Sequence, residues 1–147
     1  MSRLMTVGVA VVALLAGFCP QGLAKGSESV VKTTASIKSE GGASVLVVRL
    51  EVEKGWHVYA NPPGNDDLKP VATLVTVSGQ PKAEPAYPQG KQVIDPVVGN
   101  YRVYEGTEEI RIKLPTQPAG AVKVTVSFQA CNEKSCLQPA KISLEVN

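Results

Sequence analysis

Two cysteines near the C-terminus are the residues of this sequence whose type and spacing point most directly to chemistry. Cys131 and Cys136 have four residues between them. The flanking segments alternate apolar and polar residues over 122–128 and 142–146, a pattern typical of two half-buried strands. The pattern therefore predicts a β-hairpin with both sulfurs at its turn, close enough to form a disulfide.

The residues around this pair leave two interpretations open. A structural disulfide across so short a loop stabilises a fold by only about 2 kcal/mol, because the entropy removed from the unfolded chain grows with the loop length. A disulfide that exchanges with a partner needs exposure and a nearby positive charge that lowers the pKa of a thiol. Lys134 could supply that charge, but Glu133 beside it opposes the effect. Local charge does not decide between the two interpretations.

A second group of candidate residues lies in one short aromatic segment. Strand alternation puts Trp56 on one face and both His57 and Tyr59 on the other. We expect the tryptophan to anchor the core and the other two side chains to line a site. His57 together with Cys131 and Cys136 could form a soft metal site, but a fourth ligand is missing. We therefore expect no metal and no cofactor.

The first 24 residues have the features of a secretory signal peptide. Arg3 supplies the positive start, a short apolar run follows, and a small-x-small sequence ends at Ala24. Cys19 nearly fits a lipid-attachment site, but the bulky Phe18 before it disfavours lipidation. We expect cleavage after Ala24 and a periplasmic or secreted protein with no membrane span after cleavage.

The remaining sequence is of a length that suits one domain. Residues 25–30 are polar and Ser-rich, so we expect a flexible lead-in, followed by a domain at 31–147. The formal net charge of +2 gives no indication of binding to nucleic acid. The sequence also lacks a Gly-x-Ser-x-Gly nucleophile motif and a phosphate-binding glycine loop, which argues against a hydrolase or a nucleotide-binding protein.

The domain is predicted to be all-β, with about seven to nine short strands between Gly and Pro turns. This pattern favours an antiparallel two-sheet sandwich. Residues 91–106 fit a hairpin whose tip carries the apolar pair Val97 and Val98, which either packs down or marks a contact surface. The other expected strands are at 31–39, 43–53, 56–60, 71–77, 108–114, 122–128 and 142–146.

Four motifs occur in order along the chain. They are Gly-Trp-His-Val-Tyr-Ala-Asn-Pro at 55–62, Tyr-Pro at 87–88, the segment 99–115 ending in Ile-Arg-Ile-Lys-Leu-Pro, and Val-Thr-Val-Ser-Phe-Gln-Ala-Cys at 124–131 continued by Cys-Leu-Gln-Pro at 136–139. With these motifs the chain resembles the N-terminal periplasmic domain of the thiol:disulfide interchange protein DsbD family. The motifs cover nearly all of the domain, and the cysteine motif is the specific one.

The resemblance implies an immunoglobulin-like sandwich whose cysteine pair passes electrons, in the setting of cytochrome c biogenesis. A thioredoxin-like or membrane-embedded disulfide reductase would be the donor, and oxidised exported proteins would be the acceptors. Cys136 would form the mixed disulfide and Cys131 would resolve it. The chain has no Cys-x-x-Cys of its own, so we expect the electrons to come from another polypeptide. The alternative is a non-catalytic binding module that keeps a structural hairpin disulfide.

The resemblance also implies a cap loop that shields the cysteine pair and swings away for partners. By position this loop is 95–101, which gives Val97 and Val98 a use and includes Tyr101. Asp95 and Tyr59 would then lie near the sulfurs and influence their protonation.

Overall fold

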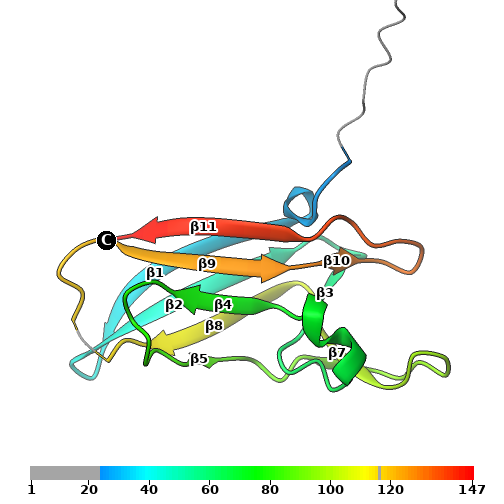
Figure 1. Ribbon diagram of the computed structural model, residues 1–147, viewed down its shortest axis with the longest axis horizontal. Helices are drawn as coiled ribbons and strands as arrows, with labels where there is room; N and C mark the ends of the chain where they lie inside the picture. The colour runs from blue at the N-terminus through cyan, green and yellow to red at the C-terminus, as the bar shows by residue number, and fades with distance from the viewer. Residues whose placement is uncertain (1–23, 116) are drawn as a thin grey trace, which may run out of the picture.

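The computed structural model describes residues 24–115 and 117–147, and its regular elements are strands apart from two short 3-10 helices (Figure 1). The expected signal peptide and Cys19 lie outside the described residues, Ala24 excepted. Within the described residues no helix is long and apolar enough to cross a membrane. The elements are the 3-10 helices η1 Ser27–Ser29 and η2 Asp66–Val71, and the strands β1 Val31–Glu40, β2 Ala43–Val52, β3 His57–Tyr59, β4 Leu74–Val77, β5 Pro85–Ala86, β6 Lys91–Val93, β7 Tyr101–Tyr104, β8 Thr107–Lys113, β9 Val122–Phe128, β10 Ala130–Cys131 and β11 Ala140–Val146.

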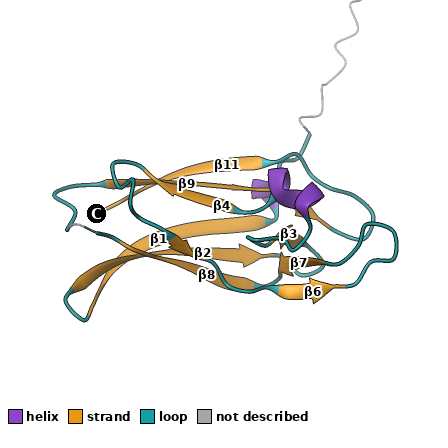
Figure 2. Cartoon of the chain, turned by 60° about the horizontal axis from the view of Figure 1, so that its bottom comes forward, coloured by secondary structure: helices purple, strands orange, loops and turns teal. Residues whose placement is uncertain are grey.

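The strands form an antiparallel sandwich, as predicted. One layer has the strand order β1-β2-β8-β5, and the facing layer has the order β11-β9-β4. A third group, β10-β3-β7-β6, lies at one end of the molecule (Figure 2). It continues both layers, because β9 runs on into β10 and β2 runs on into β3. Gly55 and Gly106, with φ of 88° and 65°, lie at the breaks between β2 and β3 and between β7 and β8, in a backbone conformation that favours glycine.

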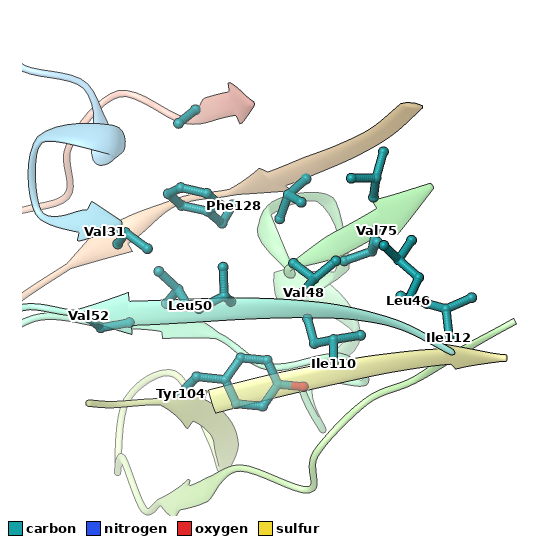
Figure 3. Packing of buried hydrophobic residues seen from close by; sticks show 14 of the residues in the cluster. Val31, Leu46, Val48, Leu50, Val52, Val75, Tyr104, Ile110, Ile112 and Phe128 are labelled. Carbon is teal, nitrogen blue, oxygen red and sulfur yellow. The ribbon is translucent and has the colours of Figure 1, made fainter. Parts of the chain in front are cut away.

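The core lies between the two layers and consists of the inward residues of the alternating strands (Figure 3). Leu46, Val48 and Leu50 of β2 are fully buried on one side. Val124 and Val126 of β9 are fully buried on the other. Since side chains alternate across a strand, this burial fixes the register of β9 and therefore the direction in which the chain enters the cysteine loop.

Two details differ from the expectations. Residues 66–71 form the helix η2 where we expected a loop and the start of a strand, because the side chain of Asn65 accepts a hydrogen bond from the Asp67 N–H at 3.0 Å and caps the turn. The strand β4 consequently begins at Leu74. Trp56 is only half-buried and packs against the edge of the core instead of anchoring it.

The segment 25–30 also differs from the flexible lead-in that we expected. It contains η1, and Ser27 in this helix is 0 % exposed. The Ser27 N–H donates to the Gln138 carbonyl oxygen at 2.8 Å, so the start of the domain is attached to the hairpin near its end. A single serine in a polar segment carries no periodicity, so this attachment could not be predicted from the sequence pattern.

We expect Leu50→Ala to lower the free energy of unfolding by about 2–5 kcal/mol, since it removes buried carbons and leaves a cavity between the layers. Leu74→Ala is the matched control, because Leu74 is 49 % exposed and should cost less than about 1 kcal/mol. Urea unfolding of both variants measures the difference. Equal losses would contradict the assigned core.

Candidate functional site

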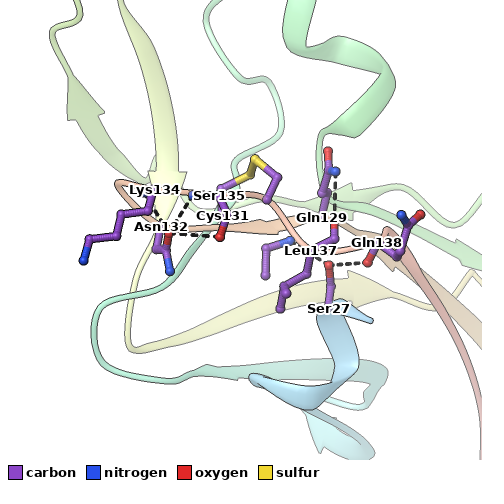
Figure 4. Close-up of a disulfide and its surroundings, with 10 residues drawn as sticks. Ser27, Gln129, Cys131, Asn132, Lys134, Ser135, Leu137 and Gln138 are labelled. Carbon is purple, nitrogen blue, oxygen red and sulfur yellow. Dashed lines mark hydrogen bonds between the residues drawn. A yellow bond between two sulfur atoms is a disulfide. The ribbon is translucent and has the colours of Figure 1, made fainter. Parts of the chain in front are cut away.

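Cys131 and Cys136 form a disulfide at the turn of the last hairpin, as the spacing suggested (Figure 4). Their sulfurs are 2.06 Å apart and their Cα atoms 4.0 Å apart. Cys131 ends β10, and the two cysteines also form an isolated antiparallel bridge. The disulfide therefore closes the end of the hairpin.

The two sulfurs differ in access. Cys131 is 2 % exposed, because it lies on β10 against β3. Cys136 lies in the exposed return of the loop. An attacking or attacked sulfur of another protein can therefore reach Cys136, whereas Cys131 meets only groups of its own chain.

The loop between the cysteines is held by Asn132. Its Oδ1 accepts hydrogen bonds from the N–H groups of Lys134 at 2.9 Å and Ser135 at 2.8 Å, and its own N–H donates to the Ser135 carbonyl oxygen at 2.9 Å. This is a side-chain-capped turn of the kind that asparagine favours. Asn132 was not predicted to have a role. An asparagine in a short loop is nevertheless a turn signal, because its side chain can bond the backbone N–H two residues on.

Further hydrogen bonds join the two arms of the hairpin just behind the disulfide (Figure 4). The Ser27 hydroxyl donates to the Gln138 carbonyl oxygen at 2.7 Å and accepts from the Ala130 N–H at 2.9 Å. The Gln129 side chain donates to the Leu137 carbonyl oxygen at 3.0 Å, and the Leu137 N–H donates to the Ala130 carbonyl oxygen at 2.9 Å. The arms are thus connected without the covalent bond.

An aromatic row leads away from the cysteines across the third sheet. His57 is the register partner of Cys131, so their side chains share one face of the sheet. The rings of His57 and Tyr59 meet edge to face at 5.8 Å between centroids, and Tyr59 meets Tyr101 in the same way at 5.8 Å. The structure therefore brings three of the candidate residues into one row that starts beside Cys131.

Burial shifts the pKa values of His57 and Tyr59 in this row. Desolvation lowers the pKa of His57, while the Glu105 carboxylate opposes that shift and the Lys91 ammonium adds to it. Desolvation also raises the pKa of Tyr59, with a smaller contribution from Tyr101. Near neutral pH both side chains are therefore uncharged. A hollow of about 440 Å³ lies beside His57 and extends to Glu133 of the cysteine loop.

The segment 95–101 forms the tip of the β6–β7 hairpin, as predicted. The Asp95 carboxylate accepts hydrogen bonds from the N–H groups of Val98 and Val97, each at 2.8 Å, and these bonds lower the pKa of Asp95. The Asn65 side chain donates to the Val98 carbonyl oxygen at 2.8 Å. Val97 is 91 % exposed and Val98 is half-exposed. Only the base of the tip, Tyr101, joins the aromatic row.

Asp95 holds the turn of its own loop. In the part of the chain that the structure describes, we find no hydrogen bond or ion pair between this loop and either cysteine. The contacts of Asp95 are thus within its own loop, and the approach of Asp95, Val97 and Val98 to the sulfurs stays a prediction.

The metal-site alternative through His57, Cys131 and Cys136 gains no support from this geometry. Both sulfurs are bonded to each other and cannot act as thiolate ligands in this state. The described residues also contain no group of three or more His, Cys, Asp or Glu side chains that could hold a metal ion.

The fold and the site together define a small immunoglobulin-like β-sandwich domain. It has a disulfide at the turn of its final hairpin, with Cys136 exposed and Cys131 buried. The family described as "Thiol:disulfide interchange protein DsbD, N-terminal" matches residues 27–147, and the chain belongs to this family. The resemblance drawn from the sequence motifs is thereby confirmed. The match begins at Ser27, the residue that joins the N-terminal segment to the hairpin.

Solved structures agree with this assignment of the fold. The reduced DsbD N-terminal domain of Neisseria meningitidis superposes with a TM-score of 0.61 at 15 % sequence identity, over 82 % of this chain and 86 % of that one. A complex between the DsbD N-terminal and PilB N-terminal domains of Neisseria meningitidis gives 0.60 at 14 % identity, over 78 % and 80 % of the respective chains. These likenesses confirm the predicted fold class.

A third structure is the N-terminal periplasmic domain of ScsB from Proteus mirabilis. It superposes with a TM-score of 0.57 at 19 % identity, over 78 % of this chain. The match spans 44 % of that longer chain. No curated protein matches the chain significantly in sequence.

The pKa of His57 offers a direct check of the site, since it is the one histidine of the chain. We expect its imidazole to titrate below 6.5 in the folded domain, by NMR. The unfolded chain then binds the proton at higher pH than the folded chain does. The free energy of unfolding should therefore fall as the pH drops through about 6.5 and level off below the folded pKa.

Two variants test the direction in which each neighbouring charge shifts the pKa of His57. Glu105→Gln should lower the pKa of His57 further, whereas Lys91→Met should raise it. Glu109→Gln is the control. Glu109 lies on β8, outside the sheet that contains His57, so this variant should leave the pKa of His57 unchanged. A His57 pKa at or above 6.5, or a shift of the wrong sign in either variant, would contradict this account of the site.

Proposed function

We propose that this chain is an exported thiol-disulfide interchange module that passes electrons through Cys131 and Cys136. Membership of the family and the disulfide itself support thiol-disulfide interchange as the chemistry. The observation that carries the proposal is the difference in access, with Cys136 exposed and Cys131 buried beside it. Exchange through a mixed disulfide requires one sulfur that a partner can reach and a second thiol close enough to resolve the mixed disulfide.

The reaction takes two displacement steps at sulfur. In the reduced domain the Cys136 thiolate attacks one sulfur of a partner's disulfide, and the partner's other sulfur leaves as a thiolate. The Cys131 thiolate then attacks the Cys136 sulfur, which forms the intramolecular disulfide and releases the second partner sulfur. Two electrons pass to the partner, whose two thiolates take up protons according to their pKa values. A reductase restores the Cys131–Cys136 dithiol by the same steps in reverse.

The partners follow from the family. We propose a thioredoxin-like or membrane-embedded disulfide reductase as donor and oxidised exported proteins as acceptors, in the periplasm or outside the cell. The solved complex of a DsbD N-terminal domain with the PilB N-terminal domain supports a protein partner for such a domain. The expected signal peptide supports export, and a role in cytochrome c biogenesis belongs to the same proposal.

The neutral aromatic row suits this chemistry. Uncharged His57 and Tyr59 beside Cys131 add no negative charge that would oppose ionisation of the thiol, and burial of Cys131 keeps this sulfur from reacting before Cys136 does. We assign them, with Tyr101, to the lining of the site.

The loop with Asp95, Val97 and Val98 is assigned as a cap that closes over the cysteine pair beside this row and opens for partners. Two exposed valines on a turn whose base already contacts Tyr59 support that assignment.

The redox titration of the mature domain tests the proposed function. We expect a midpoint above about −300 mV, the region in which exchanging disulfides lie. Cys131→Ser should accumulate a mixed disulfide through Cys136 when mixed with an oxidised partner, detected by mass, because no resolving thiol remains. Cys136→Ser is the matched control and should trap far less, since its remaining thiol is buried. A disulfide that resists reduction until the domain unfolds would favour the alternative, a binding module with a structural clip.

The cap assignment has its own test. Val97→Ser with Val98→Ser should speed reduction of the disulfide by dithiothreitol by up to about tenfold, since about 1.4 kcal/mol of apolar contact in the closed loop is a factor of ten. Leu74→Ser removes an exposed apolar side chain from β4 and serves as the control. An unchanged rate in the double variant would show that the loop does not cover the sulfurs.

A further inference from the structure

The segment that precedes β1, residues 26–29, lies against the base of the cysteine loop, and we call it the N-terminal strap. We propose that Ser27 of this strap is a positioning residue for disulfide exchange, which holds Cys131 close to Cys136 while their bond is open. The proposal rests on the exchange function proposed above and adds a residue to it that lies outside the cysteine motif.

The need for such a residue arises where the regular pairing of the hairpin ends. The ladder between β9 and β11 runs up to the pair Phe128 and Ala140. Beyond it the described residues show no backbone hydrogen bond from the Ala130 N–H to the Gln138 carbonyl oxygen. Both groups therefore need another partner.

The Ser27 hydroxyl fills this gap. It accepts from the Ala130 N–H at 2.9 Å and donates to the Gln138 carbonyl oxygen at 2.7 Å, so that one side chain joins both arms (Figure 4). The Ser27 N–H adds a second bond to the same Gln138 oxygen at 2.8 Å. Ala130 is the residue next to Cys131, and Gln138 lies two residues after Cys136.

The strap is itself fixed to the rigid part of the fold. Its helical turn is closed by bonds from Ser29 N–H to the Gly26 oxygen at 3.0 Å and from Val30 N–H to the Ser27 oxygen at 3.2 Å. The chain then enters β1, which pairs with β2 over its whole length. Ser27 is fully buried, so water does not compete for its hydroxyl. The clamp on the arms is therefore anchored in the scaffold and does not depend on the sulfur–sulfur bond.

Two consequences for the chemistry follow. While the arms are held together, the Cys131 and Cys136 thiols have a high effective concentration relative to each other. This favours the disulfide over the dithiol. The held arms also keep the Cys131 thiolate in reach of the Cys136 sulfur in a mixed disulfide, which speeds the step that releases the partner. Attack by exposed Cys136 on a partner does not use the clamp.

The test is Ser27→Ala, which removes the hydroxyl and leaves the Ala130 N–H unpaired. We expect the effective concentration of the thiols to fall about fivefold, the usual scale for one lost hydrogen bond. The midpoint then becomes less negative by ~20 mV, at about 30 mV per tenfold change for a two-electron couple.

The kinetic readout uses 5,5′-dithiobis(2-nitrobenzoate) with the reduced domain. The Cys136 thiolate releases one thionitrobenzoate and keeps the other as a mixed disulfide, and Cys131 then displaces the second as the intramolecular disulfide forms. We expect Ser27→Ala to leave the first release unchanged and to slow the second about fivefold. A purely structural role for Ser27 would lower the melting temperature without separating the two phases.

Two serine variants serve as matched controls. Ser29→Ala removes a hydroxyl from the same strap, but one that bonds only the Gly26 oxygen, at 2.7 Å. Ser44→Ala removes a buried hydroxyl that bonds the Gln117 side chain at 3.0 Å, at the far end of β2. Both should keep the wild-type midpoint and both release rates. Gln129→Ala removes the other side-chain bond between the arms and should act in the same direction, which keeps the test decisive if Ser27→Ala does not fold.

The outcomes separate the two proposals. A wild-type domain whose disulfide resists reduction would overturn the exchange function itself. A wild-type domain that exchanges, together with Ser27→Ala and Gln129→Ala variants that keep its midpoint and its second release rate, would overturn the role of Ser27 and leave the exchange function standing.

Discussion

The register of β9 is the constraint on which the rest of this structure depends. The strand is paired on both sides, with β11 and with β4, and its alternate residues face the other layer across the core. A slip of one residue would turn all of these side chains outward, so the register has one favourable setting. Since β9 runs on into β10, the same setting puts Cys131 opposite His57 and turns its sulfur away from the core. Burial in one half of the domain thus decides the geometry of the site in the other half.

The chemistry of the cysteine pair depends on the fold more than on neighbouring charges. Glu133 and Lys134 oppose each other in the sequence, and both are exposed on the loop. What distinguishes the sulfurs is their place in the hairpin, one on a paired strand and one on the open return. The polar contacts of the loop then come from neutral groups, the Asn132 amide, the Gln129 amide and the Ser27 hydroxyl. The exposed Cys136 is therefore surrounded mainly by neutral hydrogen-bonding groups.

The parts of the fold that could be predicted from the sequence are strands with one buried face, because apolar and polar residues then alternate along the strand. The strands β2, β8, β9 and β11 were expected close to their observed limits, because one face of each is apolar. The disulfide turn followed from the cysteine spacing, and the hairpin at 91–106 followed from its turn residues. The helix η2 was missed because a short polar turn has no period, although Asn65 before two aspartates is a capping signal.

The candidate site was predicted only as far as its residues are close in sequence. Alternation put His57 and Tyr59 on one face, and their rings do meet. Ser27 was missed because its partner Ala130 is 103 positions away, and no local pattern encodes that contact. The exposure of Val97 also could not be predicted, because an apolar pair on a turn has the same sequence whether it packs against the domain or faces solvent.

The bond between Ser27 and Ala130 has a consequence for how the molecule tolerates its own chemistry. It joins the first described residues to the hairpin that carries the disulfide, so the N-terminal segment cannot detach without breaking a contact of that hairpin. Most small exported domains depend on a covalent crosslink that stays closed. The exchange function that we propose opens this crosslink in each cycle, so other contacts must then hold the hairpin. The hydrogen bonds from Ser27 to both arms are contacts of this kind, because they do not depend on the sulfur–sulfur bond.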